Sequence, residues 1–188
     1  MIGLYIAIAV VVLLVLWGIT SYNKFVSQRN VVQESWRQID VELTRRHDLI
    51  PNLVETVKGY AAHEKGTLDA VISARAAATK PGATPAQQGQ QEGILGAALG
   101  RLMAVAEAYP NLKADTQFIA LQNQLTETED RSAAGRRFYN SNVRAFNTRL
   151  QAFPSSIIGN VGKFQAADYF ETEDPAVRAA PSVSFQQP

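Results

Sequence analysis

The hydrophobic pattern divides the chain into an apolar first segment and a polar body. Residues 2 to 19 contain no charged side chain. A helix of about 20 apolar residues can cross the roughly 30 Å hydrocarbon core of a bilayer. Trp17 and Tyr22 lie at the C-terminal end of this run, where amphipathic rings favour the headgroup layer. We therefore predict a transmembrane anchor over residues 1–22, with residues 2–21 in contact with the lipid bilayer.

A cleaved signal peptide is the alternative interpretation of this segment. Such a peptide normally has a basic start, a shorter apolar stretch and a small-x-small cleavage site. No Lys or Arg precedes the run here, and Gly18-Ile19-Thr20 fits a cleavage site poorly. The pattern thus favours an uncleaved anchor. The basic residues that follow it give a small positive-inside bias toward a cytoplasmic body: Lys24, Arg29 and Arg37.

Apolar residues recur at steps of three and four along residues 22–78, as in a helix that packs along other helices. They are Phe25, Val32, Trp36, Ile39, Leu43, Ile50, Leu53, Val57 and Tyr60. No breaker separates this stretch from the anchor, so we expect one rigid helix. Pro51 is the local exception, because proline inside a helix removes a hydrogen bond and costs about 3 kcal/mol. The sequence predicts either a kink there or a helix end near Asp48.

The remaining segments complete a helical pattern. Residues 79–93 are rich in Pro, Gly and Gln, which predicts a flexible loop. Further helices are expected at residues 94–109, 113–153 and, shorter, 155–165. In the first of these, Gly96 and Gly100 lie one turn apart, where small residues would let another helix approach closely. The proline-rich tail at residues 171–188 is expected to be extended or disordered.

Strand-like alternation of useful length does not occur in the sequence. The predicted fold class is therefore all-α, with an N-terminal transmembrane helix followed by a long-helix antiparallel bundle over residues 23–170. The bundle would contain three long helices plus a short fourth.

Charged and amide side chains interrupt the apolar stripes. Between Leu43 and Ile50 the first stripe meets Arg46 or His47, and a charge in a bundle core is costly unless it is paired. We favour a structural polar network that fixes helix register, in which Arg46 pairs with a carboxylate such as Glu129. Glu64 or Glu129 would meet Arg136 or Arg75. The residues assigned to the network are Arg46, Asp48, Pro51, Asn52, Glu64, Arg75, Glu129, Arg136, Tyr139, Asn140 and Asn147.

Composition and motifs offer no catalytic machinery. The net charge is +1, without the concentrated basic patch that nucleic-acid binding needs. The chain has no cysteine, which excludes disulfides, thiol nucleophiles and cysteine zinc sites. Neither His47 nor His63 follows a Glu by three, as a di-metal carboxylate bundle requires. We therefore predict no enzyme activity, no cofactor, no metal and no nucleic-acid partner.

The residues also resemble the LemA family over nearly the whole chain. The matching blocks are RRHDLIPNLVETVKGYAAHEKGTLDAVISAR (45–75), YPNLKADTQFIALQNQLTETEDRSAAGRRFYNSNVRAFNTRLQAFPSSIIG (109–159), FQAADYFE and PSVSF. The resemblance implies an N-terminal membrane segment, a long-helix bundle and no established enzyme activity. One branch of the family is associated with magnetosome membranes, and others sit beside membrane zinc proteases. Some relatives carry a lipid-attached cysteine that faces away from the cytoplasm, so the side of the membrane stays open.

Three functions are compatible with these features. The first is a scaffold or adaptor, single-pass in the bacterial inner membrane, that forms homo-oligomers or binds other membrane proteins. The second is a membrane-shaping module, since long amphipathic helices can lie on lipid. The exposed faces do not look strongly basic, which argues against strong attraction to anionic lipid. The third is a ligand sensor or enzyme that uses Arg46, Glu64, Glu129 and Arg136.

Overall fold

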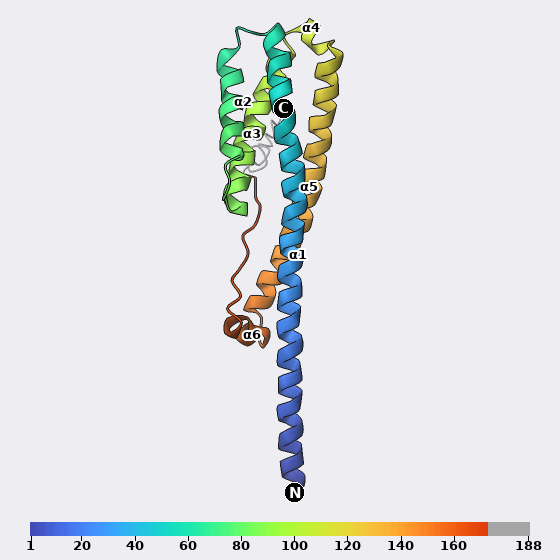
Figure 1. Ribbon diagram of the computed structural model, residues 1–188, viewed down its shortest axis with the longest axis vertical. Coiled ribbons are helices and arrows are strands. Elements are labelled where there is room, and N and C mark those ends of the chain that lie inside the picture. Colours follow the sequence, from blue (N-terminus) through green and yellow to red (C-terminus); the bar gives the residue numbers. More distant parts are fainter. Residues whose placement is uncertain (173–188) are drawn as a thin grey trace, which may run out of the picture. The chain divides into compact units, whose positions relative to one another are not determined.

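The computed structural model describes residues 1–172 of the 188-residue chain. Within them the chain forms helices and no strand (Figure 1). The helices are α1 (Ile2–Tyr60), α2 (Lys65–Ala78), α3 (Pro85–Ala106), α4 (Pro110–Lys113), α5 (Thr116–Gln151) and α6 (Ser155–Val161). The predicted all-α class, with an apolar N-terminal helix that leads into long helices, is confirmed. Most of the predicted tail, from residue 173 onward, lies outside the described residues.

Helix α1 begins with a stretch of exposed apolar side chains. Among the described residues it is the one helix that is long and apolar enough, by length and composition, to cross a membrane. None of the apolar window is buried against the rest of the protein. From Ser21 and Phe25 onward, one face of the same helix is buried. The apolar stretch and the packed seam therefore belong to a single unbroken helix.

The chain forms two compact units. Unit 1 contains residues 1–49 and 122–170, and unit 2 contains residues 50–121 and the segment from 171 onward. In α1 the division falls between Leu49 and Ile50, one residue before Pro51, but the helix continues through this proline. Pro51 itself is exposed. The predicted helix end near Asp48 is therefore wrong.

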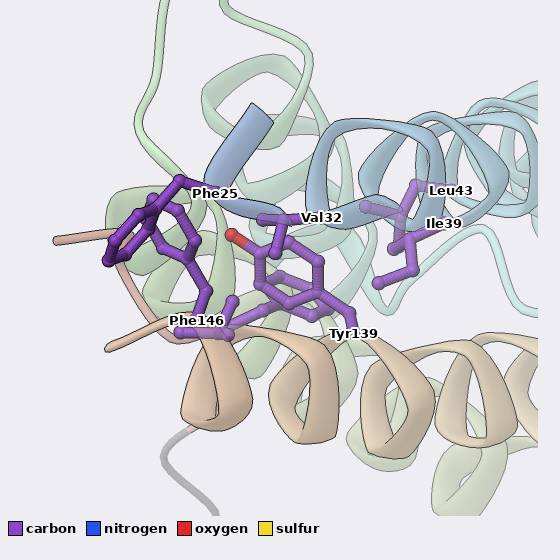
Figure 2. Packing of buried hydrophobic residues seen from close by; sticks show 8 residues of the cluster. Phe25, Val32, Ile39, Leu43, Tyr139 and Phe146 are labelled. Carbon is purple, nitrogen blue, oxygen red and sulfur yellow. The ribbon is translucent and has the colours of Figure 1, made fainter. Parts of the chain in front are cut away.

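Unit 1 pairs the first part of α1 with α5. Phe25 of α1 meets Phe146, whereas the later Trp36 meets the earlier Tyr139, so the two helices run antiparallel. Figure 2 shows their side chains converging on a shared core. The core cluster contains Phe25, Val32, Ile39, Leu43, Tyr139, Val143, Phe146 and Phe170. The stripe predicted on the first helix is the face that α5 covers.

Unit 2 contains the end of α1, helices α2, α3 and α4, and the start of α5. Its buried residues include Leu53, Val57, Leu68, Val71, Leu95, Leu102 and Leu112. At one end of the unit, the Tyr60 hydroxyl donates to Asp115 Oδ2 at 2.9 Å. Asp115 also accepts from the Phe118 N–H at 2.9 Å and so caps α5. This backbone hydrogen bond, followed by that from Tyr60, lowers the pKa of the Asp115 carboxyl.

The predicted end of the first helix is wrong. The first helix ends at Tyr60 rather than Ala78, since a turn at residues 61–64 separates it from α2. The turn allows α2 to pack its own buried stripe against α3. The residues at the turn are ordinary helix formers apart from the nearby Gly59, so no local signal marked the break.

The predicted flexible loop at residues 79–93 is too long, because α3 begins at Pro85. Thr84 and Gln87 form a capping box: the Thr84 hydroxyl accepts from the Gln87 N–H at 3.3 Å, and the Thr84 N–H donates to Gln87 Oε1 at 3.0 Å. Proline in the first helical position adds a preset backbone angle. These three residues outweigh the glutamine-rich and glycine-rich composition that suggested a loop.

The glycine that permits close approach is Gly89, not Gly100. A Cβ atom on Gly89 would overlap the carbonyl oxygen of Glu171, whereas one on Gly100 would meet nothing within 4 Å. The backbone of Glu171 is thus seated against the backbone of α3. The predicted role of Gly100 in helix approach is wrong, since that position faces open space.

Gly89→Ala is expected to destabilise unit 2 by about 1–3 kcal/mol, because the new methyl group must displace backbone. Gly100→Ala is the matched control and should stabilise the helix by roughly 1 kcal/mol. Denaturant unfolding of the detergent-solubilised full chain measures both. A neutral Gly89→Ala would show that residue 171 does not rest on α3.

Candidate functional site

Two asparagines of α5 hold the extended segment that follows α6. We name residues 163–170 the strap. The Asn140 amide donates to the Phe170 carbonyl at 3.0 Å and accepts from the Phe170 N–H at 2.9 Å. Asn147 does the same for Ala167, with both distances at 2.9 Å. Each side chain therefore satisfies both backbone groups of one strap residue, as a neighbouring β-strand would.

The spacing of these contacts is set by backbone geometry. Asn140 and Asn147 are two helical turns apart, which corresponds to about 10.5 Å along α5. Phe170 and Ala167 are three residues apart in an extended chain, which corresponds to about 10 Å. The strap runs antiparallel to α5, since the later strap residue meets the earlier asparagine. Both amides can pair at once in this one alignment.

Aromatic side chains of the strap complete the core of unit 1. The ring of Phe164 stacks on that of Phe25, with centroids 5.0 Å apart. The ring of Phe170 meets Trp36 edge-on at 5.4 Å. The strap thereby covers the part of the α1–α5 seam that two helices alone would leave open.

Tyr139 adds a further hydrogen bond to the strap. Its hydroxyl donates to the Asp168 carbonyl oxygen at 2.7 Å, and the side chain is buried. Burial, together with the nearby negative charge of Asp168, raises the pKa of Tyr139 to about 12. The phenol is therefore a neutral donor at any physiological pH.

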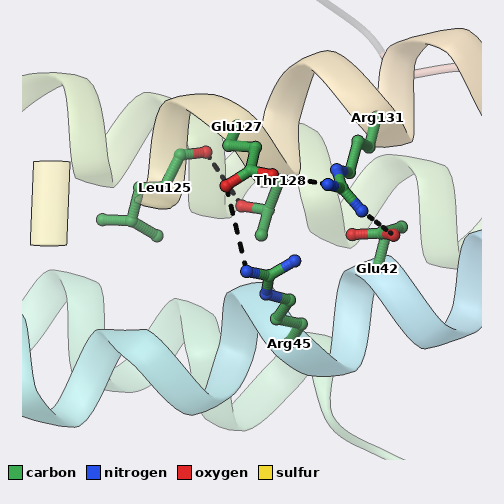
Figure 3. Close-up of polar contacts among 6 residues, drawn as sticks. All are labelled: Glu42, Arg45, Leu125, Glu127, Thr128 and Arg131. Atoms are coloured by element: carbon green, nitrogen blue, oxygen red, sulfur yellow. Dashed lines mark hydrogen bonds and ion pairs between the residues drawn. The ribbon is translucent and has the colours of Figure 1, made fainter. Parts of the chain in front are cut away.

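Charged residues link α1 to α5 further along the same pair of helices. This polar layer contains Glu42, Arg45, Arg46, Glu127, Glu129 and Arg131. Figure 3 shows Arg131 reaching Glu127 on its own helix and Glu42 on α1, at 2.5 and 3.7 Å. Arg45 lies 3.9 Å from Glu127. Each of these contacts joins an acidic side chain to a basic one.

Arg46 is the buried member of this layer. Its Nη1 lies 3.0 Å from Glu129 Oε2, and only 11% of the Arg46 side chain is exposed against 48% for Glu129. Partly exposed ion pairs contribute about 0–1 kcal/mol each. Removing the partner of a buried cation costs more, because the charge is left desolvated. The pair proposed from the sequence is thus in contact, and its role in register stays a prediction.

The other residues assigned to the polar network occupy varied surroundings. Asp48 and Asn52 are exposed, and Arg75 and Arg136 are half-buried. Glu64, half-buried at the start of α2, accepts a hydrogen bond from the Tyr109 hydroxyl at 3.3 Å. Pro51, Asn52, Glu64 and Arg75 belong to unit 2, and the remaining assigned residues belong to unit 1. The structure therefore gathers most of them around α5 and the strap.

Sequence reasoning missed a buried acid in unit 2. Glu92 on α3 is only 2% exposed, and its carboxylate accepts from Gln88 Nε2 at 2.9 Å. The same amide also contacts the Ala78 carbonyl at 2.9 Å. The spacing of Gly89, Glu92 and Leu95 on one helical face was the available signal. This signal was overlooked because Gly89 and Glu92 lie within the predicted loop at residues 79–93.

The arrangement offers contacts between helices rather than reactive groups. Among residues 1–172, no group of three or more His, Asp or Glu side chains is placed to hold a metal ion. Asn142 donates to Ser35 Oγ at 2.8 Å, and Ser35 in turn donates to the Val31 carbonyl at 2.6 Å. These polar groups join α1 to α5, which supports a positioning role for the site.

Asn147→Asp is expected to release the strap at Ala167. The carboxylate can still accept from the Ala167 N–H, but its second oxygen replaces the amide donor and faces the Ala167 carbonyl oxygen. About 1–3 kcal/mol of stability should therefore be lost. Hydrogen exchange at the Ala167 amide should become faster. Asn123→Asp, an exposed change on α5, is the matched control. Unchanged protection at Ala167 would contradict the clamp.

Tyr139 should make stability sensitive to alkaline pH. The unfolded phenol ionises near its ordinary pKa of 10.0, whereas the folded one ionises at about 12. Its stabilising contribution is fully present below pH 10 and is lost as the pH rises toward 12, by an amount on the order of 2 kcal/mol. Denaturation midpoints of the native chain and Tyr139→Phe should converge over this window. Parallel curves would contradict the assignment, since the other five tyrosines are common to both.

Comparison with known proteins gives this arrangement a family. The model described as the LemA family matches residues 35–185. Two magnetosome proteins MamQ of Paramagnetospirillum magneticum are each 28% identical to this chain over 180 residues. Each alignment covers 82% of this chain and 66% of the relative. Protein LemA of Metamycoplasma hominis is 22% identical over 152 residues, covering 78% of this chain and 69% of its own.

The chain thus spans about two thirds, 66%, of the length of the MamQ proteins it matches. The magnetosome relatives and the apolar start of α1 together indicate a membrane-associated protein. Because the family model covers most of the sequence, this protein belongs to the LemA family.

Proposed function

We propose that this protein is a non-enzymatic helical scaffold or adaptor, anchored once in the bacterial inner membrane, that self-assembles or binds other membrane proteins at the surface. The supporting observation is that the exposed apolar run and the buried seam of unit 1 lie on one unbroken helix. A helix transmits orientation along its axis, so whatever fixes the anchor also fixes unit 1.

The contacts within unit 1 strengthen this coupling. At about 1.5 Å per residue, residues 2–21 extend through roughly 30 Å, the thickness of a hydrocarbon core. The part of α1 that follows is held to α5 by the aromatic core, by the polar layer and by the strap. Such an assembly resists bending better than an anchor joined by a flexible linker, which is what a scaffold at a membrane surface requires.

The surface of unit 1 carries two exposed apolar residues at which contact with a second copy of the chain can be tested. Val41 on α1 and Phe138 on α5 are 65% and 54% exposed, although both are large apolar residues. Aromatic and aliphatic side chains of this kind are enriched at the centres of protein interfaces. They lie beyond the anchor, where lipid would not cover them.

Cysteine cross-linking in native membranes tests self-assembly directly, because the chain has no cysteine of its own. Phe138→Cys should form a covalent dimer at about twice the 20.5 kDa chain mass when a bismaleimide is added. Val11→Cys, which lies in the exposed apolar run, reports random collisions in the bilayer. The chain should also elute with a defined partner or as an oligomer after detergent extraction. Monomers alone, with no partner and no cross-link above the Val11→Cys level, would refute the proposal.

A further inference from the structure

Helix α6 presents an apolar stripe that no part of unit 1 covers. Ile157 and Val161, one turn apart on α6, are 50% and 78% exposed, and Phe153 in the turn before the helix is 83% exposed. The rest of α6 is packed on unit 1, since Gly159 is buried against Phe25 and Leu150 and Ile158 borders the core cluster. Helix α6 and the turn before it therefore expose three large apolar residues, two of them on the seven-residue helix itself, which is unusual for a surface that faces only water.

The stripe lies at the depth where α1 would leave the membrane. A Cβ atom on Gly18 would touch Ile158 at 3.8 Å, so α6 lies beside the end of the apolar run. Figure 1 shows α6 next to α1, just beyond its uncovered N-terminal stretch. With residues 2–21 spanning roughly 30 Å of hydrocarbon, α6 falls at the boundary between acyl chains and headgroups. The exposed apolar surface of the anchor therefore continues onto α6.

The same part of unit 1 is exclusively basic. Residues 1–33 and 144–167 contain no Asp or Glu, and their charged side chains are Lys24, Arg29, Arg144, Arg149 and Lys163. Phe25 and Phe164, which pack beside the end of the apolar run, have Arg149 and Arg29 over their rings at 5.3 and 5.5 Å. Basic residues within a Debye length of an anionic bilayer are attracted to it.

A groove joins these two features. It has a volume of about 550 Å³ and is lined by Gly18, Ile19 and Tyr22 of α1 and by Ile158, Val161 and Lys163. Apolar walls with a lysine at one side match the upper acyl chain and the phosphate of a phospholipid.

We propose that α6 is a second membrane contact, which inserts Phe153, Ile157 and Val161 into the leaflet around α1 while the basic residues bind anionic headgroups. This inference rests on the proposed anchoring of α1 in a bilayer. Two contacts at separate points of one rigid unit fix its tilt and its rotation about the anchor axis. An anchor alone would leave rotation free.

Depth-dependent fluorescence quenching tests the insertion. The full chain is reconstituted in vesicles of phosphatidylcholine and phosphatidylglycerol, with single cysteines at Ile157 or Val161 carrying an environment-sensitive dye. Leu13→Cys in the anchor is the positive control, and Thr44→Cys, at an exposed position of α1 far beyond the anchor, is the control outside lipid. Brominated lipids should quench the dye at 157 and 161 at least about twice as strongly as at 44, with a blue-shifted emission.

The outcomes separate this inference from the proposed function. Quenching at 13 but not at 157 and 161 would overturn the insertion of α6 and leave the anchor intact. A blue shift at 157 without quenching would also overturn it, because protein rather than lipid would then cover the stripe. Failure to quench at 13 would remove the anchor, and with it both proposals.

Discussion

Unit 1 depends on how an extended strap is kept in a helical core. Two antiparallel helices leave part of their shared apolar seam uncovered, and an extended chain can fill it only if its backbone groups are paired. Asn140 and Asn147 supply that pairing, each binding both the carbonyl and the N–H of one strap residue. Two helical turns and three extended residues have nearly the same length, so both asparagines can pair with the strap at the same time. The aromatic rings of the strap can then be buried without orphaned polar groups.

Fixing the strap also fixes what lies on either side of it. Phe164, at its start, packs on Phe25 close to the end of the apolar run, and Phe170, at its end, packs on Trp36 further along α1. Helix α6 precedes the strap and is thereby held beside Gly18. The ion pair between the buried Arg46 and the half-exposed Glu129 joins the same two helices at the other end of unit 1. A change in the register of α5 against α1 would break all of these contacts together, which favours one arrangement.

The sequence allowed the helical class and the stripe on α1 to be predicted, because both follow from a 3.6-residue period. Contacts between distant segments were harder to foresee. Asn140 and Asn147 were recognised as misplaced on an apolar face, yet their partners lie 30 and 20 residues away in a segment without periodicity. The start of α3 was predictable, since Thr84-Pro85-Ala86-Gln87 is a capping box with proline at its first position. Composition was given more weight than this local signal, and the buried Glu92 was missed with it.

The charged residues likewise show that their positions in the fold matter more than the net charge. The net charge is +1, and exposed faces that do not look strongly basic predicted only weak attraction to anionic lipid. That total conceals a separation, because the part of unit 1 around the end of the apolar run carries five basic and no acidic residues. The rest of the chain then has four more acidic than basic side chains. Composition alone does not show where along the chain the two kinds of charge lie. Since electrostatic attraction decays within about 10 Å, only the charges near the bilayer determine it. The fold brings residues 144–167 beside residues 18–33, and this juxtaposition makes a nearly neutral protein locally basic where it would meet lipid.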